Sequence, residues 1–269
     1  KKYEINGECI SDFKFDKDGF YYTLKNKVNN YFKNNKISHH ANNLWIFKSL
    51  IQFFLYIILF SYTSFYHNSN IYFRILLNLI AGHMFIQTGF GVMHDASHYA
   101  ISKYYFVNEL LSKIWNGLSL WDSKIWCLHH CYKHHSYTGT NKDPDTLHFK
   151  PFIRKSTDEK SSKYMNYNDF LALFFTCIFP GMWLGQSLVY LRAKIFKKFW
   201  RMELNDFKFS FLEILLNLFT LGGFIYSKNI FVTYSFILSC NITYFLCIVP
   251  DHDTFETHQN LITNNKEYD

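Results

Sequence analysis

Four long apolar runs restrict the folds open to this chain. They cover residues 44–66, 71–93, 209–226 and 230–249, and none contains more than one Asp, Glu, Lys or Arg. A helix needs about 20 apolar residues to cross the hydrocarbon core of a bilayer, which is about 30 Å thick. The 269 residues are therefore predicted to form an all-α integral membrane protein, with four transmembrane helices arranged as two hairpins.

The distribution of basic residues predicts which side of the membrane each connection faces. Of the 28 Lys and Arg residues, residues 1–43 hold 8, residues 94–165 hold 10 and residues 192–208 hold 6, whereas the short turns after the first and third runs contain only Lys228. Basic residues favour the cytoplasmic side, so both termini and the polar segments are expected there. This bias and attraction to anionic lipids account for the net charge of +7, and the sequence contains no nucleic-acid-binding motif.

Three further segments are expected to lie at the membrane surface. Residues 1–43 form a polar N-terminal segment whose amphipathic helix, near residues 20–32, should rest on the membrane or against the face that carries the histidines. Residues 104–121 are amphipathic and interpreted as interfacial. The apolar stretch 170–191 is interpreted as re-entrant or interfacial, because a span there would carry the basic segment 192–208 to the opposite side.

Two groups of histidines have spacings that suit metal binding from a helix. His94 and His98 are four residues apart, as are His130 and His134, and His135 lies about 100° further round the helix. Neutral imidazole binds iron, copper, zinc and nickel, so the histidines alone do not identify the metal. Both groups fall in segments expected to face the cytoplasm, where they could form one metal-binding cap.

The six cysteines contain no C-x-x-C pair, and no disulfide is expected on a reducing face. Cys127 and Cys131 are interpreted as packing residues rather than thiolate ligands, because the same helical turns already hold histidines.

The sequence around the histidines resembles a known family. The motifs are HDASH from His94, W-x-x-H-H-C-Y-K-H-H-S-Y-T-G from Trp126, and N-K-D-P-D ending at Asp145. Together they resemble the membrane fatty-acid desaturases, most of all the front-end acyl desaturases that work with cytochrome b5. The resemblance implies that the first and second histidine boxes supply catalytic metal ligands, here His94, His98, His130, His134 and His135. It also implies a weaker metal-ligand assignment for His252, which follows the last predicted span.

The sequence departs from this family in two respects. It contains neither the third box, Q-x-x-H-H or H-x-x-H-H, nor the HPGG signature of a fused cytochrome b5 domain. Residues 44–269 are therefore interpreted as a membrane desaturase domain that stops before the third box and could be inactive alone. The electron donor is expected upstream of Lys1 or on another chain.

The chemistry implied by the resemblance requires a redox-active metal. Removing hydrogen from an unactivated methylene group needs an oxidant made from O₂, which zinc cannot supply. The resemblance therefore implies two iron ions as the cofactor, O₂ as a co-substrate, and cytochrome b5 with its reductase as electron donors.

Four polar residues are candidates for orienting the imidazole rings from behind. Asp95, Asp143 and Asp145 could accept hydrogen bonds from ring N–H groups, although Asp95 equally suits a helix start and the Asp-Pro-Asp sequence suits a simple turn. His129 is expected to act in the same outer position or in a loop, not as a ligand.

A second set of residues is assigned to a substrate tunnel. His83 and Gln87 share a helical stripe with His94 and His98, because the separations are 4, 7 and 4 residues. Polar residues within spans usually have a function, so His83 and Gln87 could line the tunnel; a helix–helix hydrogen bond is an equal alternative. Trp126 and Tyr137 are tunnel-wall candidates, or else interfacial aromatic residues.

The predicted function is O₂-dependent desaturation of a long, already unsaturated fatty acyl chain in the endoplasmic reticulum membrane, with the histidines facing the cytoplasm. Two alternatives stay open. Hydroxylation of an acyl chain or sphingolipid could use the same site, and a membrane metal-binding protein without turnover would need only the histidines.

Overall fold

The computed structural model describes residues 16–138, 143–147, 163, 170, 174, 181–199, 202–204, 208 and 210–252. The described chain is almost entirely helical, with one short antiparallel strand pair that the sequence did not predict. The elements in order are α1 (Phe20–Asn34), α2 (Asn43–Phe65), α3 (Ile71–Gly89), η1 (Phe90–His94), α4 (Asp95–Ser97), α5 (Tyr105–Leu118), α6 (Ser123–Cys127), η2 (Leu128–His134), α7 (His135–Tyr137), α8 (Pro144–Leu147), α10 (Gly181–Phe196), β1 (Lys198–Phe199), β2 (Met202–Glu203), α11 (Phe211–Tyr226) and α12 (Ile230–His252).

In the described part of the chain, three helices are long and apolar enough to cross a membrane, in agreement with an integral, mainly helical protein. They are Asn43–Phe65, Ile71–Ser97 and Ile230–Cys247. The fourth predicted span corresponds to α11, an apolar helix of 16 residues, which is about 24 Å long at 1.5 Å per residue. The existence of a fourth span and the predicted orientation stay predictions.

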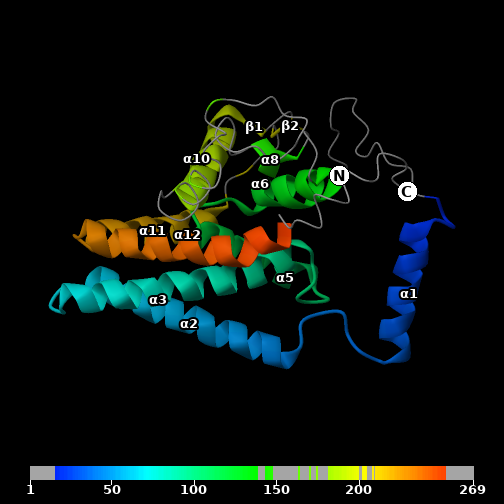
Figure 1. The fold of residues 1–269 in the computed structure, drawn as a ribbon, viewed down its shortest axis with the longest axis horizontal. Helices are drawn as coiled ribbons and strands as arrows, with labels where there is room; N and C mark the ends of the chain where they lie inside the picture. Colours follow the sequence, from blue (N-terminus) through cyan, green and yellow to red (C-terminus); the bar gives the residue numbers. More distant parts are fainter. Residues whose placement is uncertain are drawn as a thin grey trace.

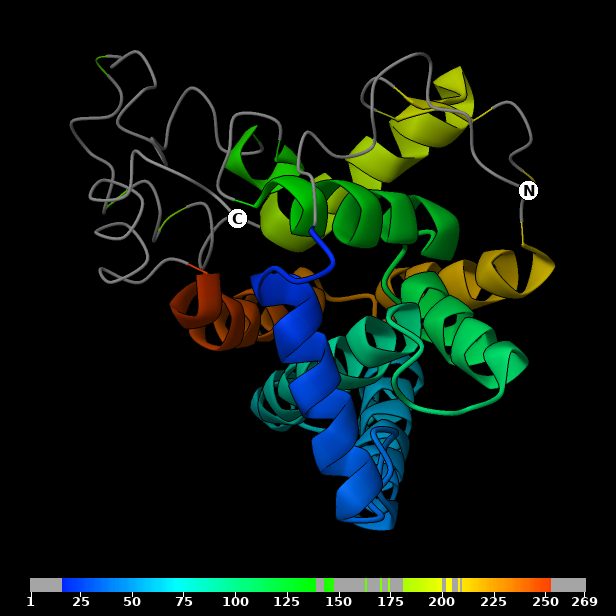
Figure 2. The ribbon, with the colours of Figure 1, turned by 90° about the vertical axis from the view of Figure 1, so that its right-hand side faces the viewer.

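The four apolar helices α2, α3, α11 and α12 run beside one another (Figure 1). α5 packs on α11, and α6 and α10 lie against one side of the bundle. α1 crosses the direction of the bundle at the end where α3 and α12 finish, and Figure 2 shows it in front of that end. None of its residues is buried.

An aromatic core holds the bundle together. Tyr56, Phe85, Trp115 and Phe236 are all almost completely buried, and their ring centroids lie 4.9–6.2 Å apart at inclined angles. Such offset and edge-on arrangements are the favoured geometry for aromatic pairs. Gly82 lets α3 approach α12 closely, because a Cβ there would lie 2.6 Å from the Phe236 carbonyl oxygen.

A buried carboxylate fixes the start of the helix that carries the second histidine group. Asp122 is 1% exposed and caps α6 by accepting hydrogen bonds from the backbone N–H groups of Lys124 and Ile125. Its other oxygen lies 3.1 Å from Lys194 Nζ on α10. Glu213 on α11 accepts a hydrogen bond from the Ser123 N–H. These contacts join α6, α10 and α11 at the start of the segment that leads into the second histidine group.

Candidate metal centre

Both histidine groups lie where the helix widens into a π-turn. These turns are η1, which ends at His94, and η2, which ends at His134. In a π-helix the hydrogen bonds join residues five apart, so those residues come to the same face. His130 and His134, four residues apart, were expected to share a helix face, and their rings do stack, with centroids 5.5 Å and planes 18° apart. In the structure His130 faces His135, with their Nε2 atoms 3.0 Å apart.

Four imidazoles from two separate helices converge at one place. One ring nitrogen from each of His94, His98, His130 and His135 lies within 4.8 Å of the others. The ring centroids of His94 are 4.7 Å from His98 and 4.8 Å from His130, and those of His98 and His135 are 4.8 Å apart. The convergence of the 94/98 pair with the second group, on which the sequence interpretation depended, is therefore present.

The surroundings lower the pKa of two of these rings, His98 and His130. Burial, followed by the neighbouring rings of His94 and His135, lowers the pKa of His130 to about 2. Burial and then His94 also lower the pKa of His98. Neutral imidazole is the form that binds metal ions, so His98 and His130 offer lone pairs without a competing proton.

The donor set fits a transition metal ion. Two nitrogens bound at about 2.1 Å and at right angles to one another are about 3.0 Å apart, which is the separation of the His130 and His135 Nε2 atoms. An all-imidazole set suits iron, copper, zinc or nickel. The arrangement supports a metal centre without identifying the metal.

Trp126 fixes the plane of one of these rings. Its indole stacks on His130, with centroids 4.6 Å apart and planes 10° apart. Trp121 stacks in turn on Trp126, with centroids 5.4 Å apart and planes 27° apart. Both indoles are buried, so they also exclude water from this side of the cluster.

His134 belongs to a second group, together with two carboxylates. Its Nδ1 lies 3.1 Å from both carboxylate oxygens of Asp143 and 3.1 Å from Asp145 Oδ2. Asp143 is 2% exposed and also accepts a hydrogen bond from the Asp145 N–H at the start of α8. The Asp-Pro-Asp sequence therefore forms a turn and holds an imidazole at the same time.

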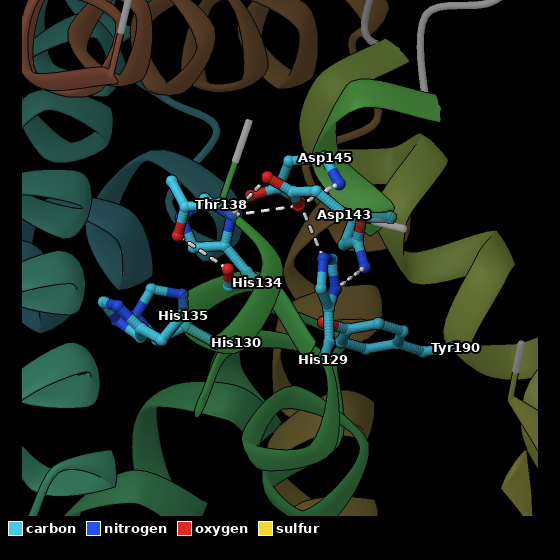
Figure 3. A network of polar contacts seen from close by, with 9 residues as sticks. His129, His130, His134, His135, Thr138, Asp143, Asp145 and Tyr190 are labelled. Atoms are coloured by element: carbon cyan, nitrogen blue, oxygen red, sulfur yellow. Dashed lines mark hydrogen bonds and ion pairs between the residues drawn. The ribbon is translucent and has the colours of Figure 1, made fainter. Parts of the chain in front are cut away.

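His129 links this second group to α10. Its Nε2 lies 2.7 Å from Asp145 Oδ1, and its Nδ1 lies 2.8 Å from the Tyr190 hydroxyl and 3.1 Å from Gln186 Nε2 (Figure 3). Both ring nitrogens are thus engaged in hydrogen bonds, in agreement with a role other than ligation. Gln186 and Tyr190 were not predicted as site residues, and their only signal in the sequence is that two polar side chains lie four residues apart in an apolar stretch.

The remaining candidates lie elsewhere. Asp95 Oδ1 is 3.0 Å from His94 Nδ1 and is partly exposed, which places it behind that ring. His83 Nδ1 is 3.0 Å from Thr243 Oγ1, and Gln87 donates to Cys247 Sγ. These are the helix–helix contacts of the packing alternative, between α3 and α12; the tunnel role stays a prediction.

Three other assignments are settled only in part. Tyr137 is buried, with Lys133 Nζ 5.5 Å above its ring, and its tunnel role, like that of Trp126, stays a prediction. His252 is the last residue of α12, but its side chain lies outside the described residues. Cys131 Sγ is 3.9 Å from His98 Nδ1, and the four described cysteines are free thiols.

Comparison with known proteins gives a consistent result. The family profile described as fatty acid desaturase matches residues 69–267. The chain is 28% identical over 188 residues to an acyl-lipid (8-3)-desaturase of Physcomitrium patens, covering 67% of this chain and 38% of that protein. It is 24% identical over 180 residues to an sn-1 linoleoyl-lipid 6-desaturase of Arthrospira platensis, covering 67% and 48%. A probable Delta(5) fatty acid desaturase C of Dictyostelium discoideum is 33% identical over 157 residues, covering 54% and 32%.

The chain spans about a third to a half of the length of these curated relatives. No solved structure matches it.

Proposed function

This chain belongs to the fatty acid desaturase family, and from that premise we propose that it carries the active centre of an O₂-dependent desaturase of long fatty acyl chains. The observation that supports the proposal most directly is the convergence of His94, His98, His130 and His135 within 4.8 Å. The relatives named as (8-3)-, 6- and Delta(5)-desaturases favour insertion of the new double bond into an already unsaturated chain.

Two iron ions are the proposed cofactor. The four clustered imidazoles would hold one part of the centre, and His134 and His252 are candidates for the rest. When bound, iron would activate O₂ as the oxidant. Two hydrogens from the acyl chain, two electrons from the donor and two protons would together reduce O₂ to two molecules of water. The electrons are proposed to come from cytochrome b5 and its reductase.

The residues of the chain itself would prepare the site. Burial keeps His130 neutral, Trp126 holds its ring and excludes water on one side, and Asp95 and Asp143 accept hydrogen bonds from Nδ1 of His94 and His134. A hydrogen bond at Nδ1 assigns the lone pair to Nε2, which is then directed to a metal ion.

The proposed setting is the endoplasmic reticulum membrane. Four spans would place the histidine-bearing ends of α3 and α12 on the cytoplasmic side, as the concentration of basic residues in residues 1–43, 94–165 and 192–208 favours. The three long apolar helices support the membrane setting.

The test is lipid analysis of cells that express the full-length protein. Desaturation gives an acyl product that has lost two hydrogens, whereas hydroxylation by the same site gives one that has gained an oxygen. His130→Ala should abolish either product while the protein still reaches the membrane. A wild-type protein that binds iron and yields neither product would contradict the proposal and favour a metal-binding protein without turnover.

A further inference from the structure

α10 reaches the second histidine group from outside the helices that carry the histidines. Two of its side chains, Gln186 and Tyr190, lie one helical turn apart and both contact Nδ1 of His129, at 3.1 Å and 2.8 Å. Neither residue belongs to a histidine motif. They are separated from His129 by 57 and 61 positions in the sequence, so only the fold brings them together.

The hydrogen bonds run in one direction from α10 to His134. Burial, followed by the charge of Asp145, raises the pKa of Tyr190, which keeps its hydroxyl protonated as a donor. The Asp145 carboxylate can only accept, so the ring proton of neutral His129 lies on Nε2 and is donated to Asp145 Oδ1. The single lone pair of Nδ1 is then shared by the Tyr190 hydroxyl and the Gln186 amide. The second oxygen of Asp145, together with Asp143, accepts from His134 Nδ1.

Three rings of this network are shielded from solvent, whereas the Asp145 side chain is 38% exposed. Tyr190 is completely buried, His129 is 3% exposed and His134 is 3% exposed. The Tyr190 ring packs against Trp121 and Phe199. Figure 3 shows Tyr190, His129 and the two aspartates following one another towards the ring of His134.

α10 is itself fixed to the helix that carries the second group. Lys194 forms an ion pair with the buried Asp122 at the start of α6, with a separation of 3.1 Å. At the other end of α10, Trp121 Nε1 donates to the Trp183 carbonyl at 3.2 Å. The position of Tyr190 relative to His129 is therefore set at two points.

We propose that Gln186 and Tyr190 are positioning residues for His134, acting through His129 and Asp145, so that the seating of α10 controls how tightly the second histidine group holds metal. The inference rests on the proposed function, because it treats His134 as a metal ligand. It adds two residues that lie beyond the histidine boxes and the Asp-Pro-Asp turn.

Metal binding by the purified full chain tests the proposal without requiring turnover. Co²⁺, which binds imidazole sites and absorbs visible light, is titrated in competition with a chelator. Outer partners of metal ligands change affinity by about 10- to 100-fold, so Asp145→Asn should weaken Co²⁺ binding in this range. Tyr190→Phe, which removes only the hydroxyl and lies further out, should weaken it about 3- to 10-fold, and Gln186→Met should act in the same direction.

A double-mutant cycle distinguishes positioning from general damage. If Tyr190 acts through Asp145, Tyr190→Phe should change Co²⁺ affinity less than about twofold when Asp145→Asn is already present. Two controls change groups elsewhere: Tyr56→Phe takes a hydroxyl from a buried ring of α2, and Leu188→Ala shortens an exposed side chain of α10 two positions after Gln186. Both should bind Co²⁺ like the wild type.

Each outcome decides one question. Additive effects of Tyr190→Phe and Asp145→Asn, or wild-type Co²⁺ affinity in both α10 variants, would overturn the positioning role even if the wild type desaturates lipids. Coupled effects on Co²⁺ affinity in a wild-type protein that yields no desaturated product would uphold the positioning role and overturn the proposed activity instead.

Discussion

At the scale of single residues, the neighbouring side chains of His134 and His135 have different partners. His135 faces His130 in the four-imidazole cluster, whereas His134 faces Asp143 and Asp145. Adjacent residues on a helix point about 100° apart, so the two rings cannot serve the same position. The residue types were readable from the sequence, but their partners depended on which face of η2 each ring occupies.

Replacing His135 by alanine is expected to disable the cluster. It removes one of four converging nitrogens, so metal affinity should fall by more than about 100-fold, since even outer partners of a ligand cost about 10- to 100-fold. Metal content of the purified protein, measured by mass spectrometry, checks this. His39→Ala is the matched control, because His39 is an exposed histidine between α1 and α2; equal loss in both variants would contradict the assignment.

At the scale of secondary-structure elements, the π-turns decide the geometry of the site. A π-turn accommodates one extra residue without changing the phase of the helix on either side. In η2 that extra residue brings Nε2 of His135 to 3.0 Å from Nε2 of His130. Sequence patterns could not reveal this, because apolar periodicity does not distinguish α-helical from π-helical spacing over two turns.

Deleting Tyr132, which is 45% exposed, should convert η2 into an α-helix while preserving the cluster. His130 and His135 would then be four residues apart and would still share a face, so metal affinity should stay within about threefold of the wild type. Inserting an alanine after Tyr132 should instead separate His130 and His135 by six residues. In an α-helix His135 would then point about 240° round the axis from His130, so metal binding should be abolished. A deletion as damaging as the insertion would refute the role of the π-turn.

A second element-level feature closes the end of the bundle away from the histidines. Arg74 is 6% exposed and donates to the Thr63 carbonyl near the end of α2 and to the Ser227 carbonyl after α11. Carbonyls at helix ends lack partners within the helix. One guanidinium group therefore satisfies two helix ends and joins the two hairpins.

Arg74→Met should destabilise the protein by about 2–4 kcal/mol, because it leaves buried carbonyls without donors, at about 1–3 kcal/mol each. Thermal unfolding in detergent measures this, and Arg74→Lys should recover part of the loss because one ammonium group reaches fewer carbonyls. Lys228→Met, at an exposed position in the neighbouring turn, should change stability little. Equal melting temperatures for Arg74→Met and wild type would exclude the role described for Arg74.

At the scale of the whole molecule, the sequence predicted the helices better than their contacts. The runs at 44–66 and 71–93 correspond closely to α2 and to α3 with η1, because burial in lipid requires continuous apolar sequence. The contact between α3 and α12 at His83 was foreseen only as an alternative to a tunnel role. It could not be predicted firmly because its partner, Thr243, is 160 positions away in the sequence. The link from Tyr190 to His129 was not predicted for the same reason.

The last feature at this scale is the exposed apolar face of the N-terminal helix α1. α1 carries an arc formed by Phe20, Leu24, Val28 and Tyr31, which are all exposed. It contains three lysines and no acidic residue, and it crosses the direction of the spans at their histidine-bearing end (Figure 1). Apolar residues flanked by lysine are typical of a helix that lies in an anionic membrane surface.

In nanodiscs that contain anionic lipid, the α1 amides should therefore be protected from hydrogen exchange, and a Leu24→Asp/Val28→Asp variant should lose most of this protection. Asn26→Asp/Asn30→Asp adds the same two charges about 180° away on the helix and should retain more protection. If both variants exchange alike, charge alone explains the effect and the apolar face does not contact lipid. Protection that survives Leu24→Asp/Val28→Asp would instead mean that α1 packs on the protein, against the histidine-bearing ends of the helices.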